Sequence, residues 1–328
     1  MAELESGNAA NRCAIGLDVG GTKIAGGVVT RDGNVQRQRA IPTEPKRGSN
    51  KVLADTVALA ESLTKDATSC GYEIDGVGLC VPELVDLQGK LISASTVDWR
   101  SVCVSSHFSH LAPTFVEADS RAAALGEAIF GAGRPFKSFF FVTIGTGIGS
   151  CLVQDGRPYA GARGCAGTLA SSSITTVCTE CGKVTEPILE ELASGPALVA
   201  RYAQKCVPDE THFSTASSDV RSPSRRTSAE DVLAGAAAGD PIAVEVVESA
   251  GIALGATVGL MINVLDPEAV VIGGGLGLAG GLYWNALITS TREHIWSETN
   301  RNLPILPAAC GVNAGLVGAA AVVWQRKS

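Results

Sequence analysis

Short apolar runs that end in glycine alternate with longer amphipathic stretches along this chain. Short runs of aliphatic and β-branched residues between turn residues predict buried strands, and apolar residues three and four positions apart predict helices. In the first third, the pattern predicts strands at Cys13–Val19, Lys23–Val29 and Val35–Ile41, a helix at Asn50–Cys70 and a strand at Val77–Val81. Strands in hairpin order, then a helix and another strand, predict a mixed sheet with helical cover.

The same order of elements recurs later in the chain. There the pattern predicts strands at Phe139–Ile144 and Ser150–Gln154, helices at Ile188–Gln204, Ala229–Ala238 and Ile242–Leu265, and a strand at Ala269–Ile272. We therefore interpret the chain as two copies of one α/β architecture, each with a glycine turn after its first strand. The stretch Phe213–Ser228 is rich in Ser, Thr and Arg, which predicts a mobile surface loop.

The composition fits a two-domain enzyme and excludes several other classes. The 328 residues, 45% of them apolar, leave room for about two domains of ~150 residues. A formal net charge of -7 argues against a nucleic-acid binder, which should carry a basic face. The polar N-terminus does not resemble a secretory signal, and the uncharged stretches Ala269–Thr291 and Asn302–Gln325 contain glycines or prolines that suit buried elements better than membrane spans. The 10 scattered cysteines suit a reducing compartment, so we expect a cytoplasmic protein.

Three glycine turns each follow a predicted strand. The residues of interest are Asp18, Gly20, Gly21, Thr22 and Lys23 in the first turn, Gly145, Thr146 and Gly147 in the second, and Gly274 and Gly275 in the third. Such turns expose backbone N–H groups that can bind phosphate, and ligands of open α/β sheets bind at the carboxyl ends of the strands. Asp18 is placed to hold Mg²⁺ through water, and Thr22 or Lys23 could reach a phosphate. The alternative for the first turn is an ordinary hairpin, and none of the three turns fits a P-loop or a dinucleotide fingerprint.

Asp119 lies between an apolar run and the strongly helical stretch Ser120–Phe130. An acid at the junction of a strand and a helix is well placed to face a cleft, where it could take a proton from a substrate hydroxyl group. The alternative is that Asp119 is only the N-cap of the helix.

These motifs carry a resemblance to a known family. The stretches that resemble motifs of the ROK family (repressors, open reading frames, kinases) are Ile15–Val28 for the first phosphate motif, Glu117–Gly133 for the acid and its helix, Phe141–Gly167 for the second phosphate motif and the sugar-binding signature, and Gly251–Leu276 and Ala314–Gly318 for the nucleotide loop and the terminal helix. Because the motifs follow the family order over residues 13 to 325, the chain is identified as a member.

The resemblance implies an actin-like ATPase fold, with two RNase H-like α/β domains around a central cleft. It implies a small domain of residues 12–118 plus 313–328 and a larger domain of residues 119–312. It also implies ATP and Mg²⁺ as cofactors, a small-molecule sugar as acceptor, Asp119 as the catalytic base and a homodimer as the assembly. A repressor of this family would carry a helix-turn-helix domain before the first motif, whereas only about a dozen polar residues precede Cys13, so we do not expect that branch.

The sugar-binding positions depart from the family pattern. Thr168 stands where the family has Glu, Ser171 where it has His, Ala118 where Asn precedes the catalytic Asp, and Thr96 where Asn precedes a Trp, while Glu190 keeps the place of a later sugar-contacting Glu. A site built for particular hydroxyl groups discriminates strongly between sugars. We therefore expect a different or bulkier acceptor, or weak activity on glucose, unless Arg121 or Arg163 supplies the missing contacts.

Departures from the family pattern also predict that structural zinc is absent. Family kinases hold Zn²⁺ with a His and three Cys, but here the His position is Ser171 and Ile188 takes the third Cys position. Cys178 and Cys181 remain, and Cys165 could add a third thiol only if its loop folds back. Structural zinc needs four ligands, so this loop is a poor site.

The function that these observations favour is ATP-dependent phosphorylation of a hexose or hexose derivative. One alternative is a catalytically weak or inactive sensor of sugar or nucleotide, because several sugar-contact positions are replaced. Polyphosphate in place of ATP is a further open alternative for the phosphoryl donor. The fold alone does not decide between them.

Overall fold

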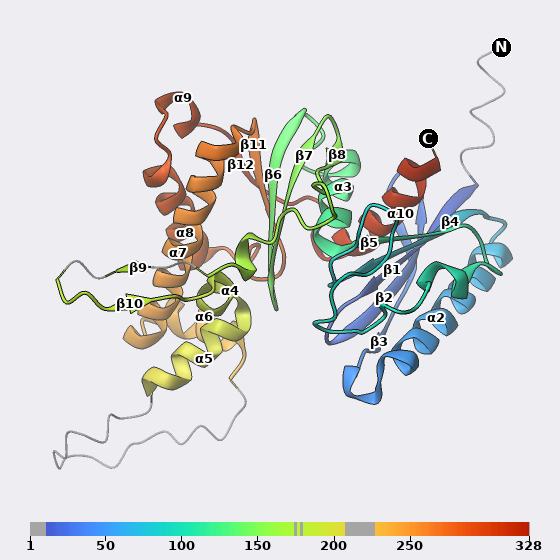
Figure 1. Ribbon diagram of the computed structural model, residues 1–328, viewed down its shortest axis with the longest axis horizontal. Coiled ribbons are helices and arrows are strands. Elements are labelled where there is room, and N and C mark those ends of the chain that lie inside the picture. The colour runs from blue at the N-terminus through green and yellow to red at the C-terminus, as the bar shows by residue number, and fades with distance from the viewer. Residues whose placement is uncertain (1–10, 174–175, 178–179, 207–226, 328) are drawn as a thin grey trace.

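The computed structural model describes residues 11–173, 176–177, 180–206 and 227–327. Two halves lie side by side, each built around one five-stranded sheet, with α3 (Asp119–Phe130) between them (Figure 1). Most of the predicted loop Phe213–Ser228 lies outside the described residues, and so does Cys178.

The first sheet has the strand order β3-β2-β1-β4-β5. Its strands are β1 (Arg12–Val19), β2 (Lys23–Thr30), β3 (Val35–Pro42), β4 (Glu73–Val81) and β5 (Thr114–Ala118). The first three strands pair antiparallel, whereas β4 and β5 run parallel to β1. Helix α2 (Ser49–Ser69) covers one face with its apolar side, as its helical spacing predicts.

The second sheet repeats this plan in the order β12-β11-β6-β7-β8. Its strands are β6 (Ser138–Ile144), β7 (Ile148–Gln154), β8 (Arg157–Pro158), β11 (Ala269–Gly273) and β12 (Ile305–Pro307). Again three strands pair antiparallel in chain order, and the two later strands run parallel to the first. The predicted α/β class and the two copies of one architecture are therefore confirmed.

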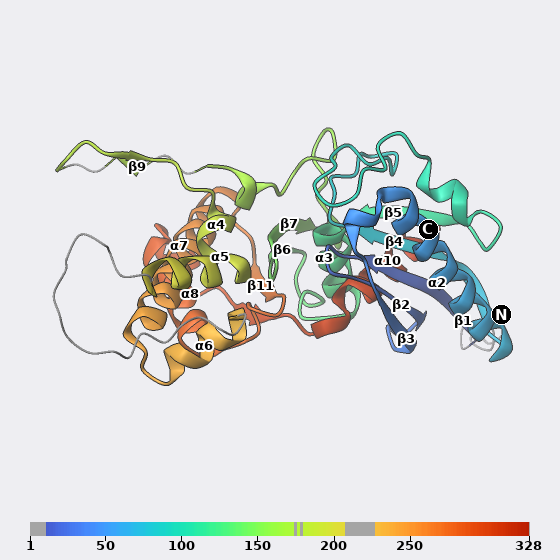
Figure 2. The same cartoon turned by 90° about the horizontal axis from the view of Figure 1, so that it is seen from below.

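The remaining elements extend the second half and return to the first. The helices are α4 (Leu189–Ala193), α5 (Gly195–Cys206), α6 (Ala229–Ala237), α7 (Pro241–Leu265), α8 (Gly281–His294), α9 (Glu298–Arg301) and α10 (Ala314–Lys327), and the short 3₁₀ turns are η1 (Pro45–Arg47), η2 (Val104–Phe108), η3 (Leu169–Ser171) and η4 (Gly311–Asn313). The hairpin of β9 (Thr176–Val177) and β10 (Val184–Thr185) projects from the second half (Figure 2).

The single helix predicted at Ile188–Gln204 is wrong, because the chain forms α4 and α5 with an extended residue, Ser194, between them. Pro196 lacks an N–H group, and its ring would clash with the carbonyl of the residue four positions before it. The proline therefore stands in the first turn of α5, where helices tolerate it. The interruption leaves the Gly195 amide free to donate to the Gly145 carbonyl on the second glycine turn (2.9 Å).

Helix α10 returns from the second half and packs on the first sheet and on α3 (Figure 1). Gly78 of β4 makes this close packing possible, since a Cβ there would collide with the Ala319 backbone of α10. The stretches Ala269–Thr291 and Asn302–Gln325, predicted as buried elements, form β11 with α8 and β12 with α10.

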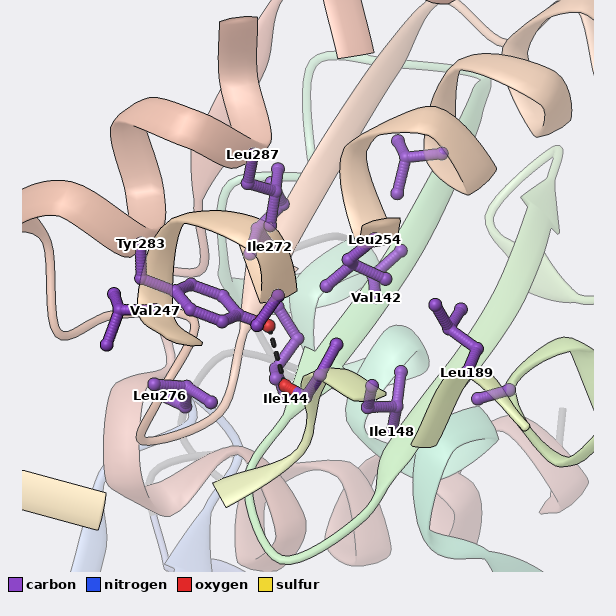
Figure 3. Packing of buried hydrophobic residues seen from close by; sticks show 14 of the residues in the cluster. Val142, Ile144, Ile148, Leu189, Val247, Leu254, Ile272, Leu276, Tyr283 and Leu287 are labelled. Atoms are coloured by element: carbon purple, nitrogen blue, oxygen red, sulfur yellow. Dashed lines mark hydrogen bonds between the residues drawn. The ribbon is translucent and has the colours of Figure 1, made fainter. Parts of the chain in front are cut away.

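The core of the second half lies between its sheet and the α7–α8 pair (Figure 3). Tyr283 is fully buried there, and its hydroxyl group donates to the Ala193 carbonyl of α4 (2.7 Å). Among the described residues, α7 is the one helix long and apolar enough to cross a membrane, and 56% of its most apolar window is buried. Its packing against α8 is that of a core helix.

Candidate active site

The first glycine turn joins β1 to β2, and hydrogen bonds hold its shape. The Gly20 amide donates to the Lys23 carbonyl (2.9 Å). The buried Thr43 donates its hydroxyl group to the Gly20 carbonyl (2.6 Å) and its amide to the Thr22 carbonyl (3.0 Å). The side chains of Thr22 and Lys23 are exposed. The turn is thus held in shape while its outer groups remain open to a ligand.

Asp18 stands half-buried at the carboxyl end of β1. The buried Cys80 thiol of the neighbouring strand β4 donates to its Oδ1 (3.4 Å). Gly315 near the start of α10 packs so closely on the carboxylate that a Cβ there would collide with it. Burial raises the pKa of Asp18, and the Cys80 thiol and the Lys23 charge offset part of that shift.

Asp119 is the first residue of α3, directly after β5. Solvent reaches its side chain, although protein surrounds the carboxylate on most sides. Desolvation, and after it the negative charge of Asp18, raises the pKa of Asp119 to about 7. The N-cap position belongs to Ala118, and among the described residues no side chain caps α3; Asp119 Oδ1 accepts the adjacent Ser120 amide (2.5 Å). The geometry therefore does not give Asp119 the role of a helix cap.

The second glycine turn joins β6 to β7 and lies beside α3. The Gly145 amide donates to the Gly147 carbonyl (2.9 Å), and Thr146 is exposed. A Cβ at Gly149 would lie 2.9 Å from the Ser120 Cβ in the first turn of α3. This contact places the second turn next to Asp119.

The third glycine turn follows β11 and packs on the second turn. Gly274 has a positive φ of 81°, and a Cβ there would collide with the Ile144 backbone. The Leu276 amide donates to the Ile144 carbonyl (3.0 Å), and Gly275 is exposed. The parallel pairing of β6 and β11 thus brings these two turns to one sheet edge.

The residues predicted to contact a sugar divide into two groups. Thr96 lies beside the first turn, because a Cβ added at Gly21 would be 3.7 Å from its Cγ2, and Ala118 is buried directly before Asp119. Glu190 lies against the second turn, where its Oε2 accepts the Ile148 amide (2.8 Å).

Thr168 and Ser171 form the other group and are exposed around η3. The Thr168 hydroxyl group donates to the Cys165 carbonyl (3.5 Å), within its own segment. That segment is attached to β7, where the Ser150 hydroxyl group donates to the Gly167 carbonyl (3.0 Å). In the described part of the chain, hydrogen bonds therefore tie these two residues to their own segment and not to the glycine turns.

Arg121 is buried and fully engaged. It donates to the Gly164 carbonyl (2.8 Å), to the Val85 carbonyl (2.5 Å) and to Glu117 Oε1 (2.6 Å). The expectation that Arg121 could replace lost sugar contacts is not met, because its guanidinium joins α3 to two loops instead. A charged residue within an alanine-rich helix was the sequence signal for such a buried link.

Two further residues near the site were not identified from the sequence. Thr43 supports the first turn, and Glu83, two residues after β4, accepts hydrogen bonds from the segment 93–97. Neither belongs to a motif. The one sequence signal for Glu83 is that it is a charged residue close to the end of a predicted strand.

Two thiols of the loop that holds zinc in family kinases can be located in the structure. Cys165 and Cys181 are both exposed, and Cys178 is outside the described residues. Within the described part, no group of three or more His, Cys, Asp or Glu residues could hold a metal ion. The absence of structural zinc therefore stays a prediction.

Comparison with known proteins supports the resemblance over nearly the whole chain. The model of the ROK family matches residues 14–326. A glucokinase of Streptomyces coelicolor is 29% identical over 313 residues, which cover 93% of this chain and 96% of that protein. A crystal structure of a ROK hexokinase from Thermus thermophilus has 30% identity and a TM-score of 0.73, covering 96% of this chain and 99% of that one.

A ROK family glucokinase from Streptomyces griseus, solved in complex with glucose and AMPPNP, has 27% identity and a TM-score of 0.77, covering 95% of this chain and 99% of that one. These structures confirm the predicted fold, two RNase H-like α/β domains of the actin-like ATPase type. The match over residues 14–326 shows that this chain belongs to the ROK family.

Proposed function

We propose that this protein is a sugar kinase that transfers the terminal phosphoryl group of ATP to a hydroxyl group of a hexose or hexose derivative. The observation that carries the proposal is the position of Asp119. Its side chain is accessible to solvent and lies beside Asp18 and next to the second glycine turn. Similarity to glucokinases over more than nine-tenths of the chain supports it.

The glycine turns fit a magnesium nucleotide. Open space surrounds Gly145 and Gly275 where a Cβ would stand, and the side chains of Thr22, Lys23 and Thr146 are exposed. Backbone N–H groups of such turns suit phosphate oxygens, and a carboxylate such as that of Asp18 suits Mg²⁺ through water. We propose that Gly20, Gly21, Gly147 and Gly274 complete this nucleotide site. Bound Mg²⁺ would neutralise charge on the transferring phosphoryl group.

Asp119 is the proposed general base. A base works best when its pKa lies near the operating pH, and the pKa of Asp119 is raised to about 7. The ionised carboxylate would accept the proton of the sugar hydroxyl group as that oxygen attacks phosphorus. The fixed amides of the turns and the Lys23 ammonium would stabilise the charge that spreads over the phosphoryl oxygens.

The acceptor that we propose is a hexose other than glucose, or a hexose derivative. Thr96, Ala118, Thr168 and Ser171 offer two amides, one carboxylate and one imidazole fewer than the family pattern, and Arg121 is engaged elsewhere. Each unpaired polar group on a buried sugar costs ~1–3 kcal/mol. The test compares kcat/KM for glucose, mannose, fructose, their N-acetylamino relatives and a disaccharide. Glucose as the best acceptor, with a sub-millimolar KM, would refute this choice.

The second candidate is a sugar or nucleotide sensor without turnover. One observation favours it: the Glu190 carboxylate, at a family sugar-contact position, is bonded to the Ile148 amide. ADP release with MgATP and the same sugars distinguishes the two candidates. A kinase releases ADP in proportion to added sugar, whereas a sensor binds without releasing it. Inorganic polyphosphate in place of ATP tests the alternative donor in the same assay.

A further inference from the structure

Glu83 is a buried carboxylate that the proposed chemistry does not yet use. It is 1% exposed and lies two residues after β4. Its partners among the described residues are all neutral donors. Oε2 accepts the Ser93 hydroxyl group (2.5 Å) and the Ser95 amide (2.8 Å), and Oε1 accepts the amides of Thr96 (2.5 Å) and Val97 (3.1 Å). A buried charge without a cation is costly unless hydrogen bonds satisfy it.

These bonds keep Glu83 ionised. Burial opposes the charged form, but the bonds from Ser93, Thr96, Ser95 and Val97 outweigh it and lower the pKa of Glu83 below its ordinary value. Three consecutive amides that converge on one carboxylate form an anion-binding nest, and charge-assisted bonds are about twice as strong as neutral ones. The carboxylate and the segment 93–97 therefore fix each other.

The segment 93–97 has no regular secondary structure, so Glu83 supplies the order that a helix or strand would supply elsewhere. Its far end is anchored by Trp99, which is fully buried and donates its indole N–H to the Ser49 carbonyl (2.8 Å). Thr96, the fourth of its five residues, lies beside Gly21 of the first glycine turn, since a Cβ added to that glycine would be 3.7 Å from the Thr96 Cγ2. The bonds to Glu83 thus set where Thr96 stands relative to the first glycine turn.

Glu83 also comes from the sheet edge that carries both acids of the site. Cys80 of β4 pairs with Asp18, and Val81 pairs with Ala118, the residue before Asp119. The chain that leaves this edge at Glu83 returns to it through the segment 93–97. The buried carboxylate of Glu83 therefore joins the carboxyl end of β4 to the segment 93–97, which lies beside the first turn.

We propose that Glu83 is a positioning residue for the sugar, which holds segment 93–97, and with it Thr96, in place beside the first glycine turn. This inference rests on the proposed function. Glu83 does not contact the acceptor itself, because its lone pairs are taken by the segment. It acts through Thr96 and the amides of its neighbours.

The test uses two substitutions at this position in the full chain. Glu83→Gln keeps the size of the side chain, but one of its two acceptor oxygens becomes an NH₂ group that faces backbone N–H donors, so part of the nest is lost. Because misplacement by ~1 Å can cost ~10²-fold, we expect the sugar KM to rise about tenfold or more and the ATP KM to change by less than about twofold. Glu83→Asp keeps the charge but shortens its reach, so its sugar KM should rise less.

Glu127→Gln is the matched control. Glu127 is fully buried and accepts the amides of Ala132 (2.8 Å), Ala309 (3.0 Å) and Cys310 (2.7 Å), so it has the same chemistry at a position away from segment 93–97. A merely structural loss lowers Tm and the amount of active enzyme, and hence kcat, while KM stays constant. We expect this pattern for Glu127→Gln.

The assay is ADP release with MgATP and the sugar of the above panel that gives the highest kcat/KM. A raised sugar KM in Glu83→Gln, or in Glu83→Asp if the first variant does not fold, supports the inference. An active wild type with an unchanged sugar KM in the folded variants overturns it and leaves the proposed function standing. A wild type that releases no ADP with any sugar overturns the proposed function and this inference with it.

Discussion

The raised pKa of Asp119 predicts a specific dependence of activity on pH. Asp119 must be ionised to accept a proton, and desolvation together with Asp18 raises its pKa to about 7. With that pKa, about one-tenth of the carboxylate is ionised at pH 6 and about nine-tenths at pH 8. We expect kcat/KM for the sugar to rise with pH through 7 and to be about tenfold lower at pH 6 than at pH 8. An ordinary carboxylate would be ionised throughout this range.

The assay measures initial rates of ADP release at limiting sugar and saturating MgATP from pH 5.5 to 9. Asp119→Asn should lose the limb near pH 7 and retain a rate lower by ~10²–10⁴. Asp155→Asn, a change of the same kind at an exposed hairpin turn with φ 49°, should keep both the limb and the rate. A wild-type profile that is flat between pH 6 and 8, or a limb that persists in Asp119→Asn, would refute the assignment of that limb to Asp119.

Three further predictions concern the turns, the core and metal. Gly274→Ala should raise the ATP KM and lower Tm, because its Cβ would collide with the Ile144 backbone at a positive φ; unchanged nucleotide binding would contradict the packing described. Tyr283→Phe should lower the free energy of unfolding in urea by ~1–3 kcal/mol, since it leaves the buried Ala193 carbonyl unpaired; no change would contradict that role. Metal analysis of protein purified without added zinc should find well under one equivalent per chain, and one full equivalent would contradict the prediction from the missing ligands.

Local patterns in the sequence are sufficient to predict most strands of the two sheets. Cys13–Val19 and Phe139–Ile144 each lie within one residue or two of the strands that form, because apolar runs before glycine turns leave few alternatives. The helix predicted at Ile188–Gln204 failed although Pro196 stands in the sequence. The apolar spacing continues across the proline, and a prediction from spacing alone takes no account of the N–H group that proline lacks.

The candidate site could be predicted only in part. Asp18 lies at the carboxyl end of β1 and Asp119 directly follows β5, so the rule that ligands bind at strand carboxyl ends finds them. Glu83 is different, because its partners lie 10 to 14 residues later in a segment without secondary structure. Glu190 was predicted as a sugar contact from its position in the family pattern, yet it bonds the Ile148 amide across a sequence separation of 42 residues. Such contacts depend on how loops fold back, and no local periodicity encodes them.

The most direct test of the proposed function compares the wild type and Asp119→Asn for ADP release with MgATP, with and without each sugar of the panel. We predict that at least one sugar stimulates ADP release by the wild type and that Asp119→Asn loses this stimulation by ~10²-fold or more while it remains folded. Equal stimulation in both proteins, or no stimulation of the folded wild type by any sugar, would contradict a sugar kinase with Asp119 as its base.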